Sequence, residues 1–186
     1  MPCFYSDLDI ILMMSYVSSD APMQMESKTD IDLRRRINDL HFVFSIFDED
    51  NGPQVLYDDS PLLDEVVRNL STKVFYFLMQ GAEFSPDNHA SIRGIIQVPH
   101  STYYTSAIDL LVEKYDVRKQ TEVYVPLVLF LIFPKKDLVF YTKIANSIED
   151  FFSKYLNDGI YGVPTLQTIT TLLKQLRKRI VNMPYV

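Results

Sequence analysis

The chain has 186 residues, of which 47% are hydrophobic, and a formal net charge of −6. This length and composition fit one domain with a sizeable core. The balance of 18 basic against 24 acidic residues excludes a protein that must neutralise phosphates over a broad surface, so we expect no nucleic-acid partner. The single cysteine, Cys3, cannot form an internal disulfide, which favours a reducing, cytoplasmic location.

Residues 1–28 are expected to form an N-terminal appendage to a single domain over residues 29–186. The apolar run "IILMMSYV", Ile10–Val17, is too short for the roughly 20 residues of a membrane helix. No Lys or Arg precedes it, as a signal peptide would require. We interpret this run as an element that packs on the domain or on a neighbour, followed by the linker "SSDAPMQMES".

The domain is predicted to open with a short helix and a β-hairpin. Thr29 and Asp32 resemble a capping box for a helix over Asp30–Leu40. The strand His41–Phe47 follows, rich in residues that favour strands, and the polar loop after it leads to the short returning strand Gln54–Tyr57. Alternation along the first strand directs three side chains to the core: Phe42, Phe44 and Ile46.

The first long helix is predicted over residues 62–79, because an apolar stripe of helical period begins after the cap Ser60-Pro61 and ends near Gly81. Three segments with strand composition follow: "SIRGIIQVP", "YYTSAIDLLVE" and Glu122–Pro134. The last is apolar on both faces and is therefore expected to be the central strand, with Pro126 near its start.

Two helices are predicted to end the chain. The first covers residues 138–155, and the second opens at Pro164-Thr165 and carries its apolar stripe as far as Ile180. The resulting order, ββαβββαα after a leading helix, predicts an α+β domain in which helices flank one five-stranded antiparallel-type sheet.

The stretch "SIFDEDNGPQVLYDDSP", Ser45–Pro61, together with the element order, resembles a longin domain. Its S-x-F, polar loop, Gly-Pro, short strand and later proline look like the opening of the nitrogen-permease-regulator-like longin proteins, and folliculin-type longin domains open similarly. The similarity covers roughly residues 41–181. In such a hairpin Gly52 supplies the turn, Pro53 sets the exit of the chain, and Tyr57 points to the packed side.

The resemblance implies a platform for small GTPases and for other longin subunits, with no cofactor of its own. One member type that opens in this way carries a catalytic arginine just before its fourth strand. Thr105 aligns with that position here, so an arginine-finger mechanism does not carry over. Arg93 is the nearest alternative, and we interpret it as a surface residue.

No enzymatic centre is evident in the sequence. A GxxxxGK[ST] phosphate loop is absent, and His41, His89 and His100 have no neighbouring ligands at metal-binding spacing. "FDEDNG" lacks the spacing of a calcium loop. Asp58 and Asp59 are interpreted as charges before the N-terminus of the first long helix. We therefore expect no enzyme activity, no cofactor, no metal site and no catalytic residue.

Basic residues cluster in the last turns of the final helix, where positive charge is favoured by the helix dipole. The alternative is a weak peripheral contact with an anionic membrane or an acidic partner. Three residues carry that alternative: Lys174, Arg177 and Lys178.

The function expected from these features is a scaffold that binds a small GTPase, a second longin domain or a roadblock domain, as in GTPase regulation and vesicle trafficking. The predicted contact is the edge formed by Gln54, Val55, Leu56 and Tyr57 with the helix face from Asp64 to Arg68. Three alternatives stay open: an adaptor that holds a peptide or SNARE-like segment, a roadblock or profilin-like module, and a homodimer.

Overall fold

The computed structural model describes residues 28–81, 91–157 and 162–183. Five strands form one antiparallel sheet in the order β2-β1-β5-β4-β3. The predicted α+β class and the predicted element order are confirmed. The elements are α1 (Lys28–Asn38), β1 (His41–Asp48), β2 (Gly52–Asp58), α2 (Asp64–Gly81), β3 (Ser91–Gln97), β4 (Tyr103–Asp116), β5 (Thr121–Pro134), a 3-10 helix (Lys135–Asp137), α3 (Leu138–Asn157) and α4 (Leu166–Val181).

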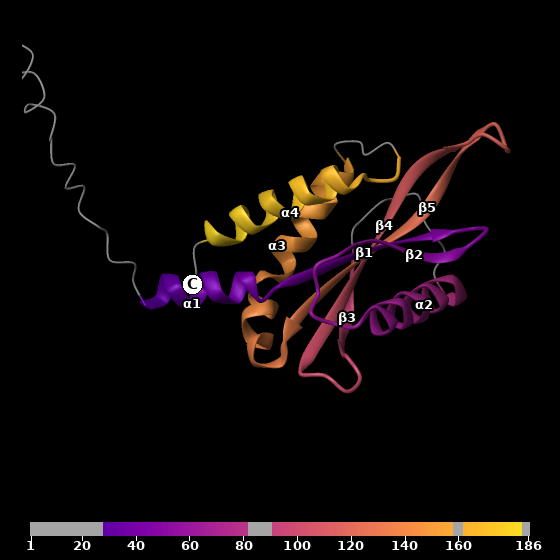
Figure 1. Cartoon of the computed structure of the whole chain (residues 1–186). Helices are drawn as coiled ribbons and strands as arrows, with labels where there is room; N and C mark the ends of the chain where they lie inside the picture. The colour runs from indigo at the N-terminus through magenta and orange to yellow at the C-terminus, as the bar shows by residue number, and fades with distance from the viewer. Residues whose placement is uncertain (1–27, 82–90, 158–161, 184–186) are drawn as a thin grey trace, which may run out of the picture.

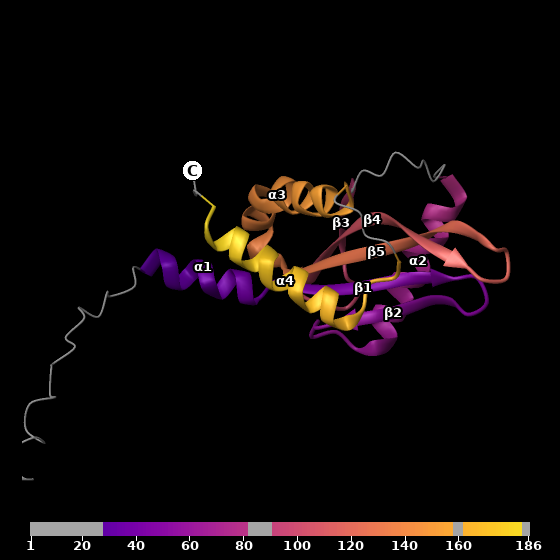
Figure 2. The ribbon, with the colours of Figure 1, turned by 90° about the horizontal axis from the view of Figure 1, so that it is seen from above.

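Helices cover both faces of the sheet: α2 packs on one face, and α3 and α4 pack on the other (Figures 1 and 2). Alternation along the strands creates the two apolar layers. In β1, Phe42, Phe44 and Ile46 join the layer beneath α3 and α4, whereas Val43 faces α2. With both faces covered, the edges and the margins of the helices remain for contacts with other molecules.

The central strand is β5, as its doubly apolar sequence predicted. It pairs with β1 on one side and β4 on the other, and its residues from Leu127 to Phe133 are buried. The strand begins at Thr121, one residue before the predicted start, and Pro126 lies five residues after Thr121. The pairing with β1 ends at Leu127, so Pro126 occupies a stretch where β5 has β4 as its only partner.

Two helix starts differ from the prediction. The helix α1 begins at Lys28, so Thr29 lies inside it, and Asp32 forms ion pairs with Arg35 and Arg36 at 2.8 Å. At the first long helix, Pro61 stays outside and α2 begins at Asp64.

The start of α4 agrees with the sequence signal. The Thr165 side chain accepts a hydrogen bond from the Thr168 amide at 3.2 Å. This bond satisfies one of the backbone donors that the first turn leaves without a helical partner.

Residues 1–27 lie outside the described residues, and with them Cys3 and nearly all of the expected appendage; His89 does too. The division into an appendage and one domain therefore stays a prediction. Within the described ranges, no helix is both long and apolar enough to cross a membrane.

We expect Tyr141 to make the protein less stable at alkaline pH. Its ring stacks on Phe133 with the centroids 4.1 Å apart, and burial raises the pKa of its hydroxyl. The folded state thus keeps this proton to a higher pH than the unfolded chain, so stability is complete below about pH 10 and falls as the pH rises further.

The substitution Tyr141→Phe should make this alkaline decline shallower. The decline should not vanish, because burial also raises the pKa of Tyr57 and Tyr155. Urea denaturation of both proteins across the range from neutral to strongly alkaline pH measures the difference. Identical slopes for the two proteins would contradict the prediction.

Candidate partner-binding surface

The strand β2 is an open edge of the sheet. It lies at one end of the strand order and pairs with β1 alone, as expected from the sequence. Gly52 has a φ of +75° at the turn, a conformation that glycine adopts without strain. The Asp48 carboxylate accepts hydrogen bonds from the backbone amides of Asn51 (2.9 Å) and Asp50 (3.0 Å), and these bonds lower its pKa.

The four predicted edge residues divide by burial. Gln54 and Val55 are exposed, whereas Leu56 and Tyr57 are half-buried against the layer beneath α4. The Tyr57 ring lies edge-on to Phe44, with the centroids 6.3 Å apart. The packed orientation suggested for Tyr57 is therefore present. A partner at this edge would mainly meet the backbone, the Val55 side chain and Gln54.

Asp64 and Arg68 are exposed on α2, which contacts β2. Residues four apart share one flank of a helix. At 100° per residue, this flank lies away from Val66, Asn69 and Lys73 on the opposite side of α2. The predicted residues therefore belong to the β2 side of the molecule, which we call the β2 surface: Gln54, Val55, Leu56, Tyr57, Asp64 and Arg68.

Asp59 fixes the end of β2 to the rest of the domain. Its carboxylate accepts hydrogen bonds from the Phe42 amide (2.5 Å), the Tyr57 hydroxyl (3.1 Å) and the Arg177 guanidinium (2.9 Å). The interpretation of Asp59 as a charge before a helix was wrong, because α2 starts five residues later. The sequence gives no signal for its pairing with Arg177, since the two are 118 residues apart.

Arg177 serves the domain itself and is half-buried. Besides Asp59, it donates to the Leu40 carbonyl at 3.3 Å and its guanidinium lies over the Phe42 ring at 5.4 Å. Of the three residues expected to form a peripheral membrane contact, Lys174 and Lys178 are exposed. Arg177 is not free for that role.

We expect Asp59→Asn to destabilise the domain by about 2 kcal/mol, because it weakens hydrogen bonds to a charged group and leaves the half-buried Arg177 without its counter-ion. Urea denaturation followed by circular dichroism measures the change. Asp58→Asn is the matched control, since Asp58 is exposed and accepts a bond only from the nearby Ser60 amide. Equal stability losses in the two variants would show that the junction has no special role.

Thr105 lies inside β4 instead of just before it. It is 2% exposed and pairs with Ile96 on β3 and Ile132 on β5. The Thr105 side chain is therefore buried in the domain, and its alignment with the catalytic arginine of that member type stays a prediction. The backbone of Arg93 pairs with Ala107, and its side chain lies outside the description. Among the described residues, no group of three His, Cys, Asp or Glu side chains could hold a metal ion.

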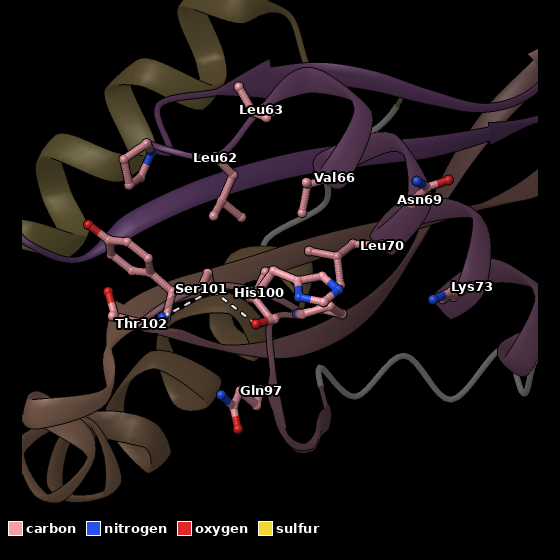
Figure 3. Close-up of a pocket in the computed structure, with 14 residues that line it drawn as sticks. Leu62, Leu63, Val66, Asn69, Leu70, Lys73, Gln97, His100, Ser101 and Thr102 are labelled. Carbon is pink, nitrogen blue, oxygen red and sulfur yellow. Dashed lines mark hydrogen bonds between the residues drawn. The ribbon is translucent and has the colours of Figure 1, made fainter.

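A groove of about 850 Å³ lies between α2 and the turn that joins β3 to β4 (Figure 3). One wall comes from Pro61–Leu63 and from Val66, Asn69, Leu70 and Lys73; the other comes from Gln97–Tyr103. The Ser101 hydroxyl shapes the turn by donating to the Val98 carbonyl at 3.0 Å and accepting from the Tyr103 amide at 3.2 Å. Sequence reasoning missed this groove because its walls come from two separate segments.

The chain matches no protein-family model and no curated protein. Among solved structures, it is similar to the K. lactis Lst4 longin domain, with 14% identity, 76% of this chain and 97% of that chain covered, and a TM-score of 0.47. The described domain is an α+β fold in which helices flank one five-stranded antiparallel sheet, the class predicted from the sequence.

Proposed function

We propose that the protein is a non-enzymatic scaffold that binds a small GTPase, a second longin domain or a roadblock domain at the β2 surface. The observation that carries this proposal is the open edge of β2 in a sheet whose two faces are covered by helices. An open edge offers backbone donors and acceptors that a partner strand can use.

The composition of β2 supports pairing over a short length. Natural edges are often protected by charges or proline. Gln54–Tyr57 contains neither, whereas Pro53 precedes this segment and Asp58 follows it. The open segment is thus four residues long. Asp64 and Arg68 place one negative and one positive charge beside it, which would help to select a partner of complementary charge.

The class of partner comes from the longin resemblance, because such domains serve as platforms for small GTPases and for other longin subunits. The proposed role is therefore GTPase regulation in vesicle trafficking, at a cytoplasmic location. A second copy of the chain could bind the same edge and would then compete with such a partner.

The test starts with affinity capture of the full chain from its own cell lysate, followed by mass spectrometry. A captured GTPase, longin or roadblock protein is then purified and mixed with the chain, and the complex is measured by size-exclusion chromatography with light scattering. The proposal expects a stoichiometric complex with one of these classes. A reconstituted complex that leaves the β2 amides unprotected from hydrogen exchange would contradict it.

The groove favours a second candidate function, an adaptor that holds an extended peptide. Its lining combines apolar side chains such as Leu62, Leu63 and Val66 with polar side chains that could bind a peptide backbone. The two functions are separable, because Leu63→Glu should affect peptide binding in the groove but not a partner on the β2 surface.

A further inference from the structure

We propose that the groove between α2 and the β3–β4 turn binds the apolar segment Ile10–Val17 of the same chain. The proposal is independent of the β2 surface, which lies on the other flank of α2. Three features favour this intramolecular occupant: its apolar composition, its charge, and the length of the chain that connects it to the domain.

The groove presents apolar surface that nothing in the described chain covers. Leu63 is 74% exposed, and Leu62 and Val66 are half-buried beside it. The segment Ile10–Val17 has seven apolar residues among eight, with Ser15 as the exception. Both surfaces leave water when they meet, which is the dominant favourable term in association.

The charges of the two partners are complementary. The groove is lined by no Asp or Glu, and it carries the positive charge of Lys73. Four of the 24 acidic residues and none of the 18 basic ones lie in residues 1–27, so this segment holds four of the six net negative charges. Asp7 and Asp9 directly precede the apolar run. Its acidic flank would be attracted to the rim of the groove.

The connecting chain is long enough. The ring of Tyr103, which lines the groove, has its centroid 6.4 Å from that of His41, the first residue of β1 and close to the end of α1. The 11 residues of α1 span about 16 Å. Residues 18–27 reach up to about 35 Å when extended, so they can lead back along α1 to the groove. A short tether gives an effective concentration of about 1 mM, which a separate peptide would have to match.

The test uses the full chain labelled with nitrogen-15, with a nitroxide on the thiol introduced by Ser18→Cys in a Cys3→Ser background. Binding in the groove should broaden the amide signals of residues 62–73 and 100–103, and reduction of the nitroxide should restore them. Leu63→Glu should abolish the broadening, because it places a negative charge in the apolar contact and close to the acidic flank of the segment, while position 63 itself is exposed. Ile11→Asp should do the same from the other side of the contact.

Val139→Glu is the matched control, because Val139 is 68% exposed on α3, on the opposite face of the sheet. This variant should keep the broadening. Unbroadened groove amides in the parent chain, or broadening that survives Leu63→Glu in a folded protein, would overturn the proposal. A nitroxide on chains without nitrogen-15 could instead broaden the signals of nitrogen-15 chains, with no broadening within a single chain. That result would assign the groove to a second copy and would equally overturn the proposal.

Discussion

Val55→Pro is expected to abolish association at the β2 surface while leaving the monomer folded. Residues two apart in a strand direct their amides to the same side, and Val55 lies two residues after Pro53. Proline is tolerated in an edge strand at positions whose amide would point away from the neighbouring strand. Pro53 therefore marks the open side of β2, and the Val55 amide is expected on that same side. The substitution removes that donor and obstructs a second strand. Size-exclusion chromatography with light scattering, with the purified partner, measures the loss.

Val55→Thr separates the backbone from the side chain. Threonine keeps the amide and the branched shape but weakens the apolar contact, so partner binding should fall only slightly. A folded Val55→Pro protein that binds as the wild type does would place the interface elsewhere, with β3, the other edge of the sheet, as the next candidate.

Phe130→Ala should cost about 3 to 5 kcal/mol of stability, because removal of a buried aromatic ring leaves a cavity. Phe130 is 1% exposed in the layer beneath α2. Its neighbours across the sheet are Val43 and Ala107, whose short side chains cannot refill the space. The loss is a large part of the roughly 5 to 15 kcal/mol that stabilises a typical domain. Urea denaturation measures it.

Tyr124→Ala provides the comparison on the same strand. Tyr124 is 51% exposed near the start of β5, and an exposed substitution of this kind usually changes stability by less than about 1 kcal/mol. An unchanged denaturation midpoint for Phe130→Ala would place its ring outside the core and would contradict the packing of α2 on the sheet.

The sequence predicted the fold well because its strongest signals are local. The helical stripe of α2 and the doubly apolar run of β5 each follow from the spacing of neighbouring residues. The placement of Phe42 and Phe44 follows from strand alternation. Helix starts were less accurate: Pro61 favours a first helical position, yet the chain turns there and α2 begins at Asp64. Local preference for a cap gives way to the path of the chain between β2 and α2.

The candidate sites were predictable only in part. The β2 edge follows from a short strand between Pro53 and Asp58. The groove requires residues 61–73 and 97–103 to meet, and the Asp59–Arg177 pair joins two ends of the chain. Thr105 shows a further limit, because the sequence did not indicate that this position is buried within β4. Contacts between distant segments arise from the packing of the sheet and helices, which no local pattern contains.

The shared bonds of Asp59 couple the end of β2 to α4. An edge strand would ordinarily fray independently of the rest of the sheet, at a low free-energy cost. Here the Asp59 carboxylate at the end of β2 also bonds Arg177 on α4, so its release would remove one contact of the final helix with this part of the sheet, while the bond from Arg177 to the Leu40 carbonyl could remain. Thermodynamic linkage makes the coupling reciprocal: a ligand that holds β2 in place protects α4 by the same free energy by which a ligand on α4 would protect β2.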